Sequence, residues 1–372
     1  MRSPGLTLSW LLRVLLLVTL PSAPGIAFGL SVAFINPGKT AEPYWTMANE
    51  VMQQAAASLD VELEILTTER DYLAQISLIE ELGQRSAESR PDYLIIAAEK
   101  SMLPGQLEAA DAAGIPVFLA FNSALGDREK VGYPRQRFSL WLGSLTPDAE
   151  EGGYLAARAL ISHAIKALPD DSSLGMIALA GDRSTHTSRQ RNQGLLRALE
   201  EFPQVTLHQQ VYADWSYGKA LGQSTHLLRR YPQAQLVWSA NDLQAFAVIE
   251  AIHASGRVPG KDVFVSAVNA TEAALEHVLS GELTALTGGH HMAGAWAIVL
   301  LYDYHHGLDF IDNSGNGELQ YSMFSLIEQP SARYLLERRR QGRSLDFCPY
   351  SRACNPARDQ YDFSFNRWLD IQ

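Results

Sequence analysis

Short apolar runs alternate with amphipathic stretches along most of this chain. The apolar runs in the first half have the length and composition of buried strands and span residues 30–35, 61–66, 93–97 and 115–121. The stretches between them place apolar side chains three and four positions apart, as helices do, and span residues 44–59, 73–87 and 103–113. This alternation predicts βαβ units and a parallel sheet covered on both faces.

The same alternation returns after a break at residues 123–138, where glycine, proline and charged residues interrupt it. Strand-like runs then span residues 174–179, 207–212, 236–239, 263–268 and 283–287. Helical stretches span residues 148–168, 189–202, 217–231, 243–255 and 271–279. Because each half carries its own apolar core, we expect an α/β fold of two doubly wound parallel-sheet lobes with a cleft between them.

Amide, carboxylate, imidazole and indole side chains follow the ends of many predicted strands. They include Asn36, Asn122, Asp182, Trp215, Asn241, Asn269 and His290. Ligands of open parallel sheets bind at the carboxyl ends of the strands. The sequence therefore predicts a site that hydrogen-bonds and stacks a small polyhydroxylated ligand.

The chain begins with a segment typical of export signals. Arg2 precedes an apolar run at residues 6–20, and small residues follow it, so residues 1–29 are predicted to be a signal peptide. The alternative is an uncleaved membrane anchor, but Arg13 interrupts the run. No cysteine lies near the cleavage point, which argues against a lipoprotein. The segment therefore predicts export across the cytoplasmic membrane.

Length, charge and cysteines narrow the possible functions. A chain of 372 residues suits two lobes, and its formal charge of −11 without a concentrated basic patch argues against nucleic-acid binding. The cysteines of the chain are Cys348 and Cys354, and in an exported protein they are expected to form a small-loop disulfide. A metal site at these cysteines is the alternative, but no histidine lies nearby in sequence.

Motifs of catalysis and metal binding are missing from the sequence. It contains no Gly-x-Ser-x-Gly elbow and no Walker phosphate loop. The pairs His290-His291 and His305-His306 are separated by a predicted helix of about 20 Å, too far apart for one ion. We therefore expect neither an enzyme nor a metal or cofactor site.

Several local motifs, taken in chain order, resemble the type I periplasmic binding proteins of sugar ABC importers, the ribose-binding and LacI-like group. They are Asn36-Pro37 with Tyr44-Trp45, Gly114-Ile115-Pro116-Val117, Arg191-Asn192-Gln193-Gly194, Ala213-Asp214-Trp215 and Asn241-Asp242. The resemblance covers roughly residues 30–310. It implies a ligand site made by Asn36, Tyr44, Trp45, Asn122, Arg191, Trp215, Asn241, Asn269 and His290.

The resemblance also implies that the chain crosses between the lobes three times, near residues 142, 290 and 320. The N-terminal lobe would then comprise residues 30–142 and about 291–320. The C-terminal lobe would comprise residues 143–290 and about 321–345. Residues 346–372, which include the expected disulfide, would form a C-terminal tail that caps a lobe or offers a partner surface.

Two departures from the family pattern bear on the ligand. Asn122 and Asn269 stand where the family usually has aspartate. An amide offers one acceptor and one donor, whereas a carboxylate accepts two strong hydrogen bonds, so a modified, acidic or non-sugar polyol also fits. We expect Asp242 to cap the helix beginning near residue 243, which would leave Asn241 free for the ligand.

The expected function is that of a monomeric periplasmic receptor that closes on a small sugar-like ligand and delivers it to an ABC permease. Two alternatives remain open. The closed form could instead dock on a membrane sensor protein such as a sensor kinase, an idea motivated by the unusual tail and by the asparagines at positions 122 and 269. The chain could also be a periplasmic carbohydrate hydrolase, because one fold hosts unrelated chemistries.

Overall fold

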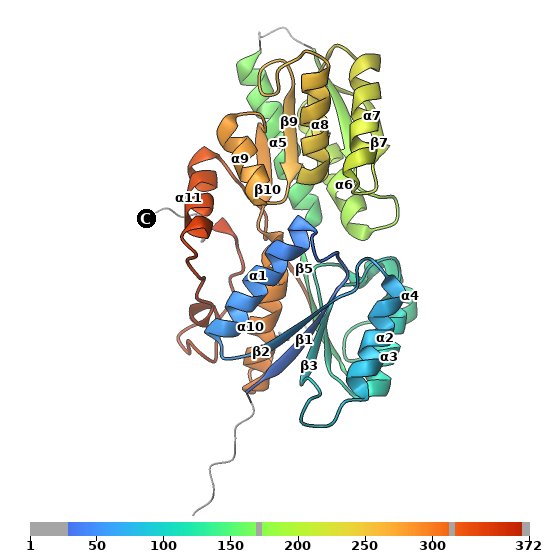
Figure 1. The fold of residues 1–372 in the computed structure, drawn as a ribbon, viewed down its shortest axis with the longest axis vertical. Coiled ribbons are helices and arrows are strands. Elements are labelled where there is room, and N and C mark those ends of the chain that lie inside the picture. The colour runs from blue at the N-terminus through green and yellow to red at the C-terminus, as the bar shows by residue number, and fades with distance from the viewer. Residues whose placement is uncertain (1–28, 169–172, 312–316, 367–372) are drawn as a thin grey trace, which may run out of the picture.

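The structure is a computed structural model that describes residues 29–168, 173–311 and 317–366. The expected signal peptide, apart from its last residue, lies outside the described residues. Within those residues two six-stranded sheets form two lobes, stacked one above the other in Figure 1. No helix in the described part of the chain combines the length and apolar character that a membrane crossing requires.

The N-terminal lobe has the strand order β11-β5-β4-β3-β1-β2, and all neighbouring strands are parallel. Its strands are β1 (Ser31–Asn36), β2 (Glu62–Thr67), β3 (Tyr93–Ile96), β4 (Val117–Ala120), β5 (Trp141–Pro147) and β11 (Glu318–Tyr321). Its helices are α1 (Pro43–Ser58), α2 (Tyr72–Gly83), α3 (Leu103–Ala113), α4 (Arg128–Val131) and α10 (Ala293–His305). A 3₁₀ turn, η1 (Ala124–Asp127), leads into α4.

Alternate side chains of β1 show how the two faces of this sheet are covered. Val32 and Phe34 belong to the core with α1 and α10, whereas Ala33 and Ile35 belong to the core with α2 and α3. A parallel sheet with helices on both faces needs apolar residues at successive strand positions. The continuous apolar runs in the sequence meet that requirement.

The C-terminal lobe has the strand order β12-β10-β9-β8-β6-β7, parallel except for the β10–β12 pair. Its strands are β6 (Leu174–Ala180), β7 (Val205–Tyr212), β8 (Ala234–Ser239), β9 (Phe264–Val268), β10 (Ala285–Gly288) and β12 (Ser325–Leu326). Its helices are α5 (Ala149–Ala167), α6 (His186–Glu201), α7 (Tyr217–Arg230), α8 (Asp242–Ala254), α9 (Glu272–Ser280) and α11 (Gln329–Arg340). Helices α5 and α6 cover one face, and α7 and α8 cover the other.

The chain passes between the lobes after β5, after β10 and between β11 and β12. The second crossing follows Gly288, and the third lies between Tyr321 and Ser325. The boundary expected at residue 142 falls inside β5, because Ser144 and Leu145 still pair with β4 of the N-terminal sheet. The first crossing therefore lies after Pro147.

The C-terminal tail packs against the N-terminal lobe. A disulfide joins Cys348 to Cys354, the pairing expected from the sequence, and the ring of Phe363 stacks on Trp296 of α10. The buried carboxylate of Asp303 on α10 accepts hydrogen bonds from tail groups: the hydroxyl of Ser351 at 2.5 Å, the amides of Arg352 at 2.8 Å and Ala353 at 3.0 Å, and the hydroxyl of Tyr361 at 2.8 Å. Residues 346–366, the part of the tail that the structure describes, are therefore bound to this lobe.

Candidate functional site

The carboxyl-terminal strand ends of the two sheets meet between the lobes, and side chains from both lobes touch there. Lys100 of the N-terminal lobe donates to the hydroxyl of Ser184 at 3.0 Å and lies 3.5 Å from the carboxylate of Asp182. The hydroxyl of Thr187 donates to the amide oxygen of Asn122 at 2.9 Å. The lobes are therefore closed on each other. We call this region the inter-lobe site.

Arg191 lies at the inter-lobe site because α5 and α6 pack backbone to backbone. A Cβ at Gly153 would lie 2.2 Å from the carbonyl oxygen of Arg191, and one at Gly194 would lie 2.1 Å from that of Glu150. Distances this short exclude any side chain, so both positions require glycine for this packing. The Gly194 of the sequence motif thus holds the helix that carries Arg191 against α5.

The guanidinium of Arg191 is buried with a relative exposure of 4%. Its Nη1 donates to the carbonyl of Ala240 at 2.6 Å and its Nη2 donates to Nε2 of His290 at 3.0 Å. Its Cζ lies 5.7 Å from the ring centroid of Trp215. Burial lowers the pKa of Arg191 to about 10, so the side chain still carries its charge at neutral pH.

His290 connects Arg191 to the N-terminal lobe. It begins the 3₁₀ turn η2 (His290–Met292), and its ring stacks between Tyr44 at 5.1 Å and Phe324 at 4.6 Å, centroid to centroid. Burial and the nearby charge of Arg191 hold the pKa of His290 well below its usual value, so the ring is neutral. Because Nε2 accepts from Arg191, the ring proton is assigned to Nδ1.

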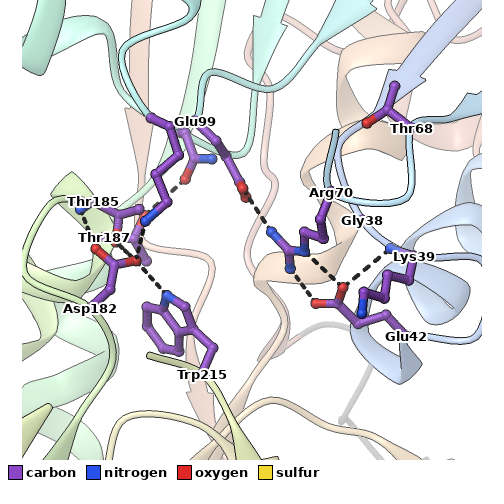
Figure 2. A network of polar contacts seen from close by, with 12 residues as sticks. Gly38, Lys39, Glu42, Thr68, Arg70, Glu99, Asp182, Thr185, Thr187 and Trp215 are labelled. Carbon is purple, nitrogen blue, oxygen red and sulfur yellow. Dashed lines mark hydrogen bonds and ion pairs between the residues drawn. The ribbon is translucent and has the colours of Figure 1, made fainter. Parts of the chain in front are cut away.

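Asp182, which followed a strand end in the sequence but was not chosen as a ligand residue, organises the loop after β6. It accepts a hydrogen bond from the amide of Ser184 at 2.6 Å. It also accepts from the amide of Thr185 at 2.7 Å and from Nε1 of Trp215 at 2.7 Å (Figure 2). Burial alone would raise its pKa, but these hydrogen bonds outweigh burial and lower the pKa of Asp182 to about 2. Asp182 thereby fixes the indole of Trp215.

A second charged group, on the N-terminal lobe, was not predicted. Arg70 after β2 pairs with Glu99 at 2.7 Å, and its Nε donates to Glu42 at 3.0 Å (Figure 2). The relative side-chain exposures are 26% for Arg70, 24% for Glu42 and 11% for Glu99. In the sequence these residues look like ordinary surface charges, although Arg70 and Glu99 each follow a strand end within three residues, which was the available signal.

Two of the residues expected in the site are engaged inside the N-terminal lobe. The amide of Asn36 accepts from the backbone of Gly38 at 2.8 Å and donates to Asn49 at 2.9 Å. Trp45 is 3% exposed, and its ring packs against Phe121 with centroids 5.1 Å apart. Trp45 is therefore a core residue and does not offer an open face for stacking.

The expected roles of Asn241 and Asp242 are exchanged. Asn241 caps α8, because its side-chain oxygen accepts from the amide of Gln244 at 2.9 Å. Asp242 is buried and accepts from the amide of Asn269 at 2.8 Å and from the hydroxyl of Thr271. The expectation that Asp242 is the cap and Asn241 is free was wrong, because Asp242 joins two strand ends. Burial raises the pKa of Asp242 despite these hydrogen bonds.

Within the described residues, no three His, Cys, Asp or Glu side chains group as metal ligands would. The inter-lobe site consists of hydrogen-bonding groups and aromatic rings from both lobes, and such an arrangement can hold a small polar ligand. Of the residues expected from the sequence, it brings together Tyr44, Asn122, Arg191, Trp215 and His290.

Comparison with known proteins places this fold and site in a family. Residues 32–308 match the periplasmic binding protein domain. The ribose import binding protein RbsB of Bacillus subtilis is 25% identical over 257 residues, 69% of this chain and 74% of that protein. The D-allose-binding periplasmic protein of Escherichia coli is 24% identical over 266 residues, 70% of this chain and 80% of that protein.

A solved structure gives the same result at higher identity. A periplasmic sugar-binding protein from Pseudomonas fluorescens is 36% identical, with a TM-score of 0.80, and the match covers 91% of this chain and 99% of that one. The family match also covers well over half of the chain. This chain therefore belongs to the periplasmic binding protein family.

Proposed function

We propose that this protein is the solute receptor of an ABC importer and that it captures a sugar-like ligand between its lobes. The observation that carries the proposal is the inter-lobe site itself, where Tyr44, Asn122, Arg191, Trp215 and His290 come together from both lobes. The relatives support it, since they are named for ribose import and D-allose binding. They are binding proteins and not enzymes, and membership of their family places the chain in the periplasm.

Ligand capture follows from hinge closure. A ligand that touches both lobes makes all its contacts only when the lobes are closed, so its binding shifts the population toward the closed form. The contacts Lys100–Asp182 and Asn122–Thr187 exist only in that form because their partners lie on different lobes. The closed form then presents a surface that the permease can distinguish from that of the open form.

A thermal-shift screen tests ligand capture. Protein purified from the periplasm is heated with ribose, allose, galactose, arabinose and inositol, each over a range of concentrations. A ligand at about 100 times its dissociation constant should stabilise the folded state by roughly 2.7 kcal/mol. The proposal would be contradicted if none of these sugars or polyols changed the melting temperature.

Two variants separate binding from folding. Trp215→Ala should abolish the shift, because the indole is fixed at the inter-lobe site by Asp182. Leu196→Ala is the control, since Leu196 is exposed on the outer part of α6 and should leave the shift unchanged. Delivery is tested in cells: deleting the gene should abolish uptake of the identified ligand, and undiminished uptake would contradict the transport role.

A further inference from the structure

Arg191 is a buried cation whose partners are both uncharged. Its two observed hydrogen bonds go to the carbonyl of Ala240 and to the neutral ring of His290. Nε of Arg191 is buried and has no hydrogen-bond partner. Across the described residues, no carboxylate lies within ion-pair distance of this guanidinium. Buried charges in proteins are normally paired, because an unpaired one costs several kcal/mol.

The carboxylates near Arg191 are already occupied. Asp242 is held by Asn269 and Thr271, and Asp182 is held by the loop amides and the indole described above. On the opposite lobe, Arg70 pairs with both of its neighbouring carboxylates. None of these acids is free to turn toward Arg191 without leaving its own donors unpaired.

His290 adds a second unfilled donor beside the first. Its ring is 5% exposed, and Nδ1, which carries the ring proton, has no hydrogen-bond partner. Arg191 and His290 are themselves joined at 3.0 Å. The unfilled groups of this pair, Nε of Arg191 and Nδ1 of His290, are therefore both donors, and the carboxylate of Asp242 acts on the guanidinium only from beyond ion-pair distance.

We propose, on the basis of the function proposed above, that the ligand is a sugar acid whose carboxylate pairs with Arg191. The hydroxyls of a neutral sugar can accept hydrogen bonds, but they cannot neutralise a buried charge. A carboxylate does both, and the planar guanidinium suits its two oxygens. One cation beside a neutral imidazole matches the single negative charge of a carboxylate better than the two charges of a phosphate.

The test compares ligands that differ only in this group. Glucose is compared with glucuronate, and galactose with galacturonate, at neutral pH and constant ionic strength. For at least one pair, the acid should bind about tenfold tighter or more than its neutral partner, as measured by calorimetry or thermal shift, because hydrogen bonds to charged groups are the stronger ones. Glucose 6-phosphate is included to distinguish a phosphate from a carboxylate.

Variants on α6 test whether Arg191 is the residue responsible for the preference for the acid over the neutral sugar. Arg191→Gln should reduce the ratio of acid to neutral affinity to about one, whereas Arg191→Lys should keep part of it because the charge remains. Arg197→Gln is the matched control, since Arg197 lies on the same helix but pairs with Glu150 and Glu151. Circular dichroism and the melting temperature of each free variant establish that it is folded.

The outcomes distinguish this inference from the proposed function. If neutral sugars bind as tightly as their acids or more tightly, the sugar-acid inference fails while sugar capture stands. Tighter binding of glucose 6-phosphate than of glucuronate overturns the carboxylate as the preferred group. If neither sugars nor acids bind, both proposals fail. The comparison of each neutral sugar with its acid is made on the wild-type protein, so it does not depend on whether any variant folds.

Discussion

The two lobes treat their buried charge in opposite ways. On the N-terminal lobe, Arg70 pairs with Glu42 and Glu99, so this cation has carboxylate partners without a ligand. On the C-terminal lobe, Arg191 is more deeply buried and has only uncharged partners. The difference teaches that the arginine of the N-terminal lobe has anionic partners within the free protein, whereas Arg191 has none within ion-pair distance among the described residues.

The largest expected effect on stability comes from separating α5 and α6, the helices whose packing positions Arg191 at the inter-lobe site. Gly194→Val would place a Cβ 2.1 Å from the carbonyl of Glu150, so α6 would have to move away from α5. We expect the free energy of unfolding, measured with denaturant, to fall by about 3 kcal/mol. Gly222→Ala on α7 is the control, because a Cβ there meets no atom within 4 Å. An equal loss in both variants would contradict the role given to Gly194.

The next effect tests the contrast between the lobes directly. Arg70→Met leaves the carboxylates of Glu42 and Glu99 without their cation, and partial exposure limits the cost to about 2 kcal/mol of unfolding free energy. Arg191→Met removes a charge that no carboxylate pairs, which offsets the lost hydrogen bonds to Ala240 and His290. We expect its unfolding free energy to change by less than about 1 kcal/mol. A larger loss for Arg191→Met than for Arg70→Met would overturn the contrast.

A smaller effect is expected from pH at the second crossing between the lobes. Burial beside Arg339 lowers the pKa of His291 to about 3, compared with about 6.5 when unfolded. Below about pH 6.5 this histidine is protonated in the unfolded chain but not in the folded chain. Its contribution to the free energy of unfolding is therefore fully present above that pH and is lost as the pH falls. Between pH 7 and pH 5.5 the loss at this residue should be about 1 kcal/mol.

Thermal melts across this pH range measure the effect. His291→Gln should reduce the dependence of the melting temperature on pH but not remove it, because the lowered pKa of His290 contributes in the same direction. His226→Gln, at an exposed position on α7, should leave the dependence unchanged. An identical pH dependence in wild type and His291→Gln would show that His291 is protonated in the folded protein.

The smallest expected effect concerns the ion pair between Lys100 and Asp182, which joins the two lobes. Lys100→Met removes a partly exposed ion pair with Asp182, worth about 0.5 kcal/mol, and should weaken ligand binding about two- to threefold. Asp182 keeps its other donors, so the free protein should unfold at nearly the same temperature. Lys130→Met is the control, because Lys130 pairs with Asp127 within one lobe. Equal ligand affinity in wild type and Lys100→Met would show that this contact does not contribute to closure.

The alternation of the sequence was enough to predict most of the fold. Continuous apolar runs indicated β1 and β6 within a residue of their bounds, and Gly114 marked the end of α3. The strands β5, β11 and β12 were not predicted. β11 and β12 are short edge strands, and the partners of β11 lie more than 150 residues away, so no local pattern marks them.

The site was only partly predictable, because a strand end fixes where a residue lies but not which way its side chain turns. Trp45 and Trp215 both follow strand ends, yet one fills the core and the other is fixed beside Arg191. Capping propensity could not separate Asn241 from Asp242, because burial against the next strand decided it. The Arg70 group was missed because its members come from three separate loops.

The late strands have a consequence for how the protein is made. The N-terminal sheet receives β11 and the C-terminal sheet receives β12 from the last sixth of the chain. The N-terminal sheet therefore cannot acquire its final strand until the chain has been made as far as residue 321, nor the C-terminal sheet until residue 326. Pairing between segments so distant in sequence is slow, since the loop entropy is lost before the contacts form. The two lobes are separate in space but should reach completion together in time.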